Sequence, residues 1–261
     1  MAGTKKFSLA KLDLRGLVLP ALLLLIWQLV TQSGSVDTRI IVPPSAVLES
    51  GWNTLIGGEL WEGLKASLFR DVSGFLLGAL AGIGLGVLLG VSRFANDFLG
   101  PTFHGLKHIS LFAWVPLLSA VFGRDDLAKI VFVAFSTLFP VVLATLEGVR
   151  GILKSQIEVA QVHGFNRWQT ITRLVLPAAS PQILSGLHLG LIYAWLATIG
   201  GEFILASTGE GLGFIVIRGR VSFHVDLIIV GMLFIGVTGL VFNHIATRIE
   251  ARLLHWRGVR H

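Results

Sequence analysis

One long polar segment, residues 150–177, interrupts an apolar chain, and its residue types suit contact with a partner outside a membrane. Its candidate contact residues combine a carboxylate, a cation, small residues and a closing apolar pair: Glu158, Ala160, Gly164, Arg167, Leu176 and Pro177. We expect a short helix over about 156–162 that presents Glu158 and Ala160 to the partner. The glycine permits the sharp turn that would end this helix, and the proline should break the segment before the next apolar run.

A second group of candidates lies within the apolar runs, where an ionisable side chain is costly and marks a functional site by default. Glu202 could be functional, or it could be hydrogen-bonded to the glycine-rich stretch 207–213. We expect a gate or structural residue, with Arg218 or Arg220 as its partner. The candidate pathway residues are His108, Ser110, Ser119, His188 and Trp195. Each of these could instead form an interhelical hydrogen bond or pack as an aromatic ring.

Several kinds of chemistry are excluded by motifs that the sequence lacks. Cysteine is absent, so a disulfide framework or a cysteine metal site is excluded. The eight histidines show no His-Glu-x-x-His spacing, and there is no Gly-x4-Gly-Lys-Ser/Thr loop for ATP. We therefore expect a non-catalytic chain that itself holds no metal or cofactor. The net charge of +6 comes from basic residues that flank apolar runs, which indicates membrane topology rather than a nucleic-acid partner.

The elements that must position these residues are predicted by the apolar runs. Hydrophobic residues make up 53% of the chain and charged residues 14%, against about a quarter charged in soluble domains. Continuous runs approach the roughly 20 residues that cross a bilayer, which predicts an all-α, polytopic membrane protein rather than a β-barrel. The six expected spans are Gly16–Thr31, Val72–Val91, His108–Phe122, Leu127–Val149, Ile183–Ala206 and Leu227–Ala246.

Charge sets the expected orientation of these spans. Lysine and arginine are twice as numerous in the segments on the N-terminal side of the membrane as on the other side. The positive-inside rule therefore places both termini and the polar segment in the cytoplasm. The resulting organisation is a tail at 1–15, a first span at 16–31, an outer loop at 32–71, a five-helix core at 72–249 and a second tail at 250–261.

The outer loop carries an apolar stripe at helical spacing from Val47 to Leu64, with Trp52 and Trp61 in it. This pattern predicts a helix that lies at the membrane surface. Anchoring in the membrane is the preferred interpretation of its role, and recognition of another molecule is the alternative.

The second expected span contains glycines at four-residue steps: Gly74, Gly78, Gly82, Gly86 and Gly90. Glycine lets helix backbones approach closely in a bilayer. We interpret the ladder as tight packing inside one subunit, and an interface between subunits is the alternative.

The polar segment closely resembles the signature of ABC importer permeases, Glu-Ala-Ala-x3-Gly-x9-Ile-x-Leu-Pro. The match holds at Glu158, Ala160, Gly164, Leu176 and Pro177 and departs, by apolar substitutions, at Val159 and Leu174. The stretches 86–93, 114–117 and 201–213 resemble the sulfonate, taurine and nitrate branch of these permeases, and aliphatic sulfonate and taurine permeases most of all. Val121 and the charged turn at Arg124 depart from that branch.

The resemblance implies a type I ABC importer permease fold in a bacterial inner membrane, with the third and fifth spans lining the pathway. Its partners would be a second copy of the chain, two cytoplasmic ATP-binding subunits, an extracytoplasmic substrate-binding protein and membrane lipid. The helix in the polar segment would be the coupling helix, docked in a groove of the ATPase subunit that binds ATP and Mg. The implied substrate is a small organic sulfonate or taurine-type anion, with nitrate, bicarbonate or another small molecule as alternatives.

Two rival classes stay open at this point. A secondary transporter would show inverted repeats and broken helices at the midplane, and no clear repeat is present. A membrane-embedded enzyme would need a catalytic constellation, and Glu202, His188 and His108 have no motif spacing.

Overall fold

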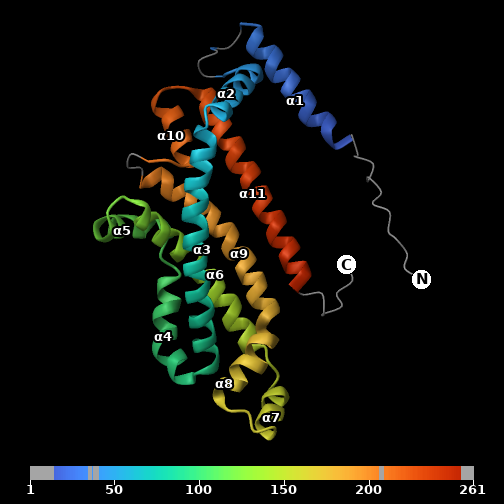
Figure 1. Cartoon of the computed structure of the whole chain (residues 1–261), viewed down its shortest axis with the longest axis vertical. Coiled ribbons are helices and arrows are strands. Elements are labelled where there is room, and N and C mark those ends of the chain that lie inside the picture. The colour runs from blue at the N-terminus through green and yellow to red at the C-terminus, as the bar shows by residue number, and fades with distance from the viewer. Residues whose placement is uncertain (1–14, 35–36, 38–40, 206–208, 254–261) are drawn as a thin grey trace, which may run out of the picture.

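The computed structural model of the chain describes residues 15–34, 37, 41–205 and 209–253, and every regular element in them is a helix (Figure 1). The elements are α1 (Arg15–Gln32), α2 (Pro44–Ile56), α3 (Glu59–Val91), α4 (Arg93–Leu106), the 3-10 helix η1 (Leu111–Trp114), α5 (Val115–Phe122), α6 (Asp126–Arg150), α7 (Lys154–Val162), α8 (Arg167–Gln169), the π-helix η2 (Thr170–Val175), α9 (Leu176–Ile204), α10 (Leu212–Val221) and α11 (Val225–Leu253). The all-α prediction is therefore confirmed for the described residues.

Four helical runs in this part of the chain are long and apolar enough to cross a membrane: α3, α6, Arg167–Ile204 and Val225–Arg252. They agree with the second, fourth, fifth and sixth expected spans, although α3 begins at Glu59, well before the expected Val72. Of the basic residues in the N-terminal tail, Lys5, Lys6 and Lys11 lie outside the described residues, and Arg15 begins α1. The total of six spans and the location of both termini therefore stay predictions.

Of the third expected span, His108–Phe122, the structure makes Leu111–Phe122 helical, and this part alone is not among the four candidate spans of the described chain. Helix α4 ends at Leu106, and after a short turn η1 and α5 continue at an angle of 96° to α4. Pro116 lies in the first turn of α5, where its missing N–H costs no helical hydrogen bond. The change of direction lies at residues 107–110, before the proline, and the α4–α5 pair is bent rather than one straight span.

The first expected span is a helix, α1, but it falls among the shorter apolar helices of the described chain rather than among the four spans. It contacts the rest of the molecule mainly through α2, beside which it lies in Figure 1. The Gln28 side-chain amide donates to the Ser45 hydroxyl over 3.2 Å and accepts the Ser45 N–H over 3.3 Å. Most apolar side chains of α1 are exposed, so α1 is not part of the packed core.

The expected single surface helix from Val47 to Leu64 is divided between two helices. Helix α2 ends before Gly57, and Gly58 has a φ of +82°, a left-handed conformation that glycine adopts without strain. Trp61 and Leu64 consequently belong to α3. Within α2, Val47 is buried in a core cluster, whereas Trp52 is exposed.

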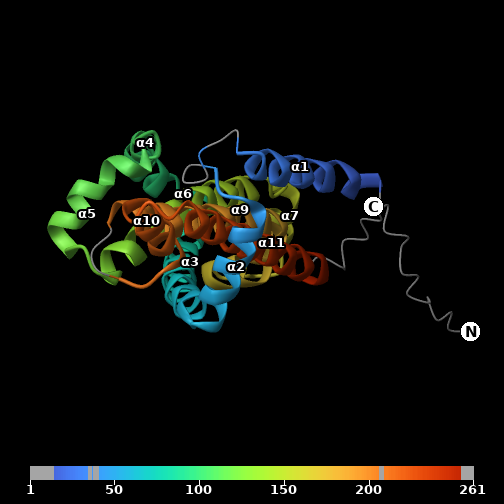
Figure 2. The same ribbon diagram turned by 90° about the horizontal axis from the view of Figure 1, so that it is seen from above.

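The core of the bundle is α6, packed between α3 and α9; α5 and α11 lie on opposite sides of it (Figure 2). The glycine ladder of α3 makes the close approach to α6. A Cβ at Gly78 would lie 2.4 Å from the Ala134 carbonyl oxygen, and one at Gly86 would lie 2.6 Å from the Thr145 Cβ. Gly84, which is out of step with the ladder, has no atom within 4 Å of its Cβ position. The interpretation as packing inside one subunit is confirmed.

Candidate functional site

The polar segment contains the expected short helix, α7, which starts at Lys154 and ends at Val162. The turn after it is a Schellman motif, in which two N–H groups past the helix bond back to its last carbonyls. The Phe165 N–H donates to the Ala160 carbonyl over 3.0 Å, and the Gly164 N–H donates to the Gln161 carbonyl over 2.9 Å. Gly164 has a φ of +72°, so this glycine is required by the backbone conformation and not by crowding.

The outward surface of this segment differs from the expectation in one residue. Glu158 and Arg167 are exposed, but Ala160 is buried, at 6% exposure. After Gly164 the chain turns back, and the Phe165 N–H bonds to the Ala160 carbonyl. Ala160 therefore adds little to the exposed surface of the segment, and its part in coupling stays a prediction.

Apolar side chains take the place of Ala160 on the outward surface, and the sequence analysis missed them. Val159, Val162 and Trp168 are 57%, 85% and 73% exposed in this otherwise polar segment. Exposed apolar residues that gather in one patch can mark a surface that contacts another macromolecule. These residues could have been recognised from the sequence, because valine and tryptophan stand out in a segment that is otherwise polar.

Pro177 had been expected to break the helical segment, but the helix continues through it. Asn166 caps α8, and the helical run then continues without a break from Arg167 to Ile204. The turn before the proline is the π-helix η2, and Pro177 lies in the first turn of α9. The wider π turn changes the hydrogen-bond register where proline cannot donate, so the run continues through it. Leu176 and Pro177 therefore join the loop to α9.

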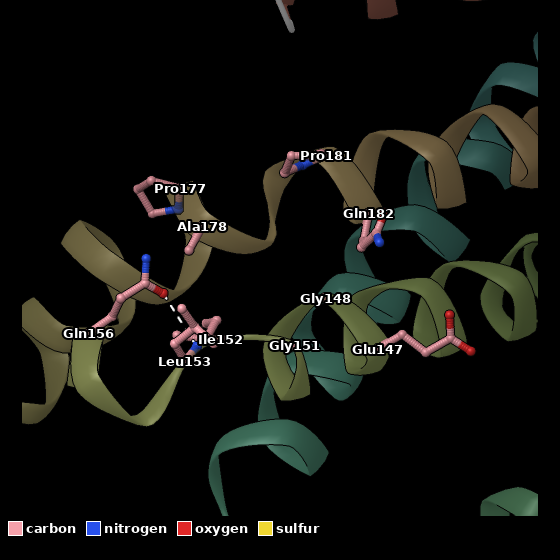
Figure 3. Close-up of a pocket in the computed structure, with 10 residues that line it drawn as sticks. All are labelled: Glu147, Gly148, Gly151, Ile152, Leu153, Gln156, Pro177, Ala178, Pro181 and Gln182. Atoms are coloured by element: carbon pink, nitrogen blue, oxygen red, sulfur yellow. Dashed lines mark hydrogen bonds between the residues drawn. The ribbon is translucent and has the colours of Figure 1, made fainter. Parts of the chain in front are cut away.

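A pocket of about 420 Å³ lies at the base of this loop (Figure 3). Its walls come from the end of α6, the first turn of α7 and the first turns of α9, with lining residues Glu147, Gly148, Gly151, Ile152, Leu153, Gln156, Pro177, Ala178, Pro181 and Gln182. The Gln156 side chain accepts the Leu153 N–H over 3.3 Å and so caps the start of α7. The pocket separates α7 from the α6–α9 pair on this side.

Glu202 lies at the other end of the long run and is fully enclosed, at 2% exposure. One carboxylate oxygen accepts the Ser67 hydroxyl over 2.7 Å and the Arg70 guanidinium over 2.8 Å. The other accepts the Gly213 N–H over 2.8 Å, which is the expected contact with the glycine-rich stretch. The expected partners were wrong, because Arg218 instead pairs with Glu59 at the surface.

The arginine that neutralises Glu202 belongs to a wider buried cluster. Arg70 also bonds Asp126 over 2.7 Å and the Glu210 carbonyl over 2.6 Å, and so joins α3, α6 and the segment before α10. Next to it, Asp71 accepts the Thr198 hydroxyl over 3.0 Å. Arg70 and Asp71 directly precede the expected span Val72–Val91. Two adjacent charged residues at the edge of a span could have indicated this cluster, but they were not among the candidates. No group of acidic or histidine ligands in the described residues could hold a metal ion.

His188 and Trp195 lie on one face of α9 and both contact α11. The two ring nitrogens of His188 lie 3.0 Å from a Glu250 carboxylate oxygen and 2.9 Å from the Asn243 side-chain oxygen. The Trp195 indole N–H donates to the Ile235 carbonyl over 3.2 Å. Both residues line a pocket of about 320 Å³ between these helices. Interhelical bonding therefore accounts for both polar groups, and a role in transport stays a prediction.

The other three pathway candidates lie in the bent region from the end of α4 to α5, and none of them lines the pocket of His188 and Trp195. His108 and Ser110 are exposed in the turn between α4 and η1, and Ser119 is half-buried in α5. Because α5 and α11 are on opposite sides of the bundle, the structure of one subunit does not bring the five candidates together (Figure 2).

Comparison with known proteins places the chain in a transport family. Residues 75–256 match the family described as binding-protein-dependent transport system inner membrane component. The chain is 33% identical to the Bacillus subtilis protein SsuC, which is named as an aliphatic sulfonates transport permease, over 94% of this chain and 88% of that protein. It is 32% identical to the bicarbonate permease CmpB of Synechococcus elongatus, over 98% and 93% of the two chains. It is 31% identical to the nitrate permease NrtB of Leptolyngbya laminosa, over 89% and 84%.

Among solved structures, the fold is similar to that of the MetNI methionine ABC transporter in an inward-facing conformation. The TM-score is 0.61, with 19% sequence identity, and the match covers 76% of this chain and 95% of the other. At this identity the likeness concerns the fold alone.

Proposed function

The chain belongs to the family of binding-protein-dependent transport system inner membrane components, and we propose that it forms the path by which a small organic sulfonate crosses the membrane. It is the permease subunit of an ABC importer, in the branch that includes sulfonate, nitrate and bicarbonate permeases, and it is a multi-pass protein of the inner membrane. The observation that carries the sulfonate assignment is the similarity to SsuC along almost the whole chain.

The loop that contains α7 is the surface on which an ATP-hydrolysing subunit docks. Support comes from its exposed carboxylate and guanidinium, Glu158 and Arg167, and from the exposed apolar residues Val162 and Trp168 beside them. This combination of an apolar centre with polar neighbours is typical of protein interfaces. ATP and Mg bind to that subunit, because this sequence has no phosphate-binding loop, and the permease itself is not catalytic.

The assembled importer contains two copies of this chain, two ATPase subunits and an extracytoplasmic binding protein that delivers the substrate. The family description, which names a binding-protein-dependent system, supports the delivery step. The bicarbonate relative, named as the permease of a transport system, supports a transporter of several subunits, and a homodimer is the commonest symmetric assembly.

The test is uptake by the reconstituted complex in liposomes, with its ATPase and binding protein. We expect ATP-dependent uptake of taurine or an alkanesulfonate and none of nitrate or bicarbonate. Nitrate or bicarbonate uptake without sulfonate uptake would favour the second candidate, which rests on nearly equal identity to CmpB and NrtB. Uptake that follows an ion gradient and ignores ATP would contradict the proposal.

A further inference from the structure

We propose that a groove between the end of α3 and the α8–η2 segment binds one anionic phospholipid, with an acyl chain along α3 and the head group at Arg167. The inference goes beyond the proposed function, because it concerns a lipid partner and not the transported substrate. The groove adjoins the proposed docking surface and shares Arg167 and Trp168 with it. A lipid bound there borders both the membrane and the ATPase subunit.

The groove has a volume of about 870 Å³ and two walls of different character. The wall on α3, over residues 83–91, is apolar, and Ser92 ends it. The opposite wall runs from Gln161 at the end of α7 to Leu176 at the start of α9, and it includes Arg167. The junction of α3 with α4 and the helix α8 lie at the same end of the molecule (Figure 1), so Ser92 and Arg167 mark one end of the groove, which we call its mouth.

The length of the α3 wall suits an acyl chain. Ile83 and Ser92 are nine residues apart, which is about 14 Å along a helix axis. One leaflet of the hydrocarbon core is about 15 Å thick, half of the roughly 30 Å of a bilayer. Helix α3 is one of the four runs that can cross a membrane, and Arg93 follows directly after Ser92. The wall therefore extends from the membrane surface to about the middle of the bilayer.

Gly84 opens the α3 wall of the groove. It is exposed, and its Cβ position has no atom within 4 Å, whereas the glycines of the ladder are crowded by α6. Packing inside the chain therefore does not require a glycine at this position, and glycine is unfavourable in a helix interior. The missing side chain leaves room on this wall for a chain that comes from outside the protein.

The mouth of the groove is basic, and it carries an aromatic residue suited to the membrane surface. Arg167 lines it, and no lining residue is acidic. The Arg173 guanidinium carbon lies 6.0 Å from the centre of the ring of Phe165, another lining residue. Trp168 is 73% exposed there, and tryptophan is enriched at the level of lipid head groups. Basic pockets between membrane helices favour anionic head groups, so the charge selects among the lipids that reach the mouth.

A phospholipid suits this groove better than a second copy of the chain. The exposed apolar residues of α3 continue beyond the groove to Leu80, Leu77 and Leu76, as in a helix that faces lipid. A two-fold interface through this face would bring the arginines of two copies to the same edge of the interface, where like charges repel. An anionic lipid brings the opposite charge to the same place.

The experiment uses the full-length permease in nanodiscs, without the ATPase, and phosphatidylglycerol that carries a photoreactive diazirine on one acyl chain. After illumination, the labelled peptides are identified by mass spectrometry. We expect label on residues 83–91 and 165–176, about fivefold more than from phosphatidylcholine with the same chain, because an arginine near the membrane surface favours an anionic lipid by about that factor. Glycerophosphoglycerol, which is the head group without its chains, and inorganic phosphate should not compete.

Two variants with matched controls test the two parts of the site. Gly84→Leu fills the α3 wall and should remove most of the label, whereas Ala81→Leu, which is exposed on α3 outside the groove, should leave it unchanged. Arg167→Gln should lower the advantage of phosphatidylglycerol over phosphatidylcholine about fivefold. Arg248→Gln, exposed on α11, should leave that advantage unchanged.

Equal labelling by the two lipids would overturn the inference, since any lipid at the protein boundary would give that result. A groove that stays unlabelled in the unaltered permease would also overturn it, as expected if a second copy covers this face. Competition by the head group alone would assign the mouth to a soluble anion and contradict the lipid site. Mapping of the unaltered protein needs no folded variant. None of these measurements uses substrate or ATP, so a failure of sulfonate uptake would affect the proposed function alone.

Discussion

The two ends of the molecule use charged residues in opposite ways. At the end that carries α2 and α10, Glu202 is buried and receives three hydrogen bonds from Ser67, Arg70 and Gly213. At the end that carries α7, Glu158 and Arg167 are exposed, and neither forms an ion pair within the described residues. The same residue types thus hold helices together at one end and remain free for a partner at the other.

The largest effect on stability should come from removing the arginine of the buried cluster. Arg70→Met leaves Glu202 enclosed without its cation, which should cost about 3–5 kcal/mol of unfolding free energy. Denaturant unfolding in detergent measures this change. Arg218→Gln breaks the exposed pair with Glu59 at the same end and should cost less than about 1 kcal/mol. Similar losses in the two variants would remove the distinction between buried and exposed charges on which the comparison rests.

A smaller effect should follow from a methyl group added to the closed interior. Gly78→Ala places a Cβ against the Ala134 carbonyl, where the helices must separate, and should cost about 1–3 kcal/mol. Gly84→Ala, on the same helix but in open space, should change stability by less than about 1 kcal/mol. Thermal unfolding of both purified variants tests this. If the Gly78 variant is as stable as the unaltered protein, the close packing of α3 on α6 is wrong.

At the α7 end, the effect of replacing Gly164 should depend only on whether the new residue tolerates the left-handed backbone conformation, because its Cβ position is uncrowded. Gly164→Leu forces a branched side chain into the left-handed region, which should cost about 1–2 kcal/mol locally and greatly reduce transport-linked ATPase activity. Gly164→Asn is the matched control, because asparagine tolerates this conformation, and it should retain most of the activity. Uptake and ATPase assays on the reconstituted complex decide between these results. Full activity in the leucine variant would show that the turn does not position α7.

The smallest effect on stability should come from the exposed carboxylate. Glu158→Lys removes no internal bond, so the unfolding free energy should change by less than about 0.5 kcal/mol. The same change should abolish the transport-linked ATPase activity, because it reverses the charge presented to the partner. Glu62→Lys, exposed on α3, controls for added charge. A stable variant with normal uptake would mean that Glu158 is not part of the docking surface.

Local features of this molecule could be predicted from the sequence because they depend on neighbouring residues. The helix in the polar segment and the turn at Gly164 follow from short-range rules, and the structure contains both. The close packing of α3 on another helix could likewise be predicted, because the four-residue spacing places the glycines along one side of α3. The burial of Ala160 was missed because it depends on how the chain returns after the turn, which spacing does not reveal.

Long-range pairings could not be predicted in the same way. Arg70 and Glu202 are 132 residues apart, and several arginines were available as partners for the carboxylate. Only the approach of α3 to α9 selects Arg70. The bend before α5 was hidden for a related reason, since hydropathy reports that residues are apolar and not whether the helix through them is straight. The π turn before Pro177 could not be predicted either, because a proline in the sequence indicates a helix break and not the π turn that avoids it.

The unbroken run from Arg167 to Ile204 gives the molecule a mechanical property. Its 38 residues make a rod of about 57 Å, with the α7 loop attached at one end and Glu202 near the other. A rod of that length, turned by about one degree about one end, moves the opposite end by about 1 Å. A displacement of that size exceeds what the bonds around Glu202, at 2.7–2.8 Å, can absorb. If the run moves as one body, a small rotation at the loop strains the bonds that hold Glu202 at its other end.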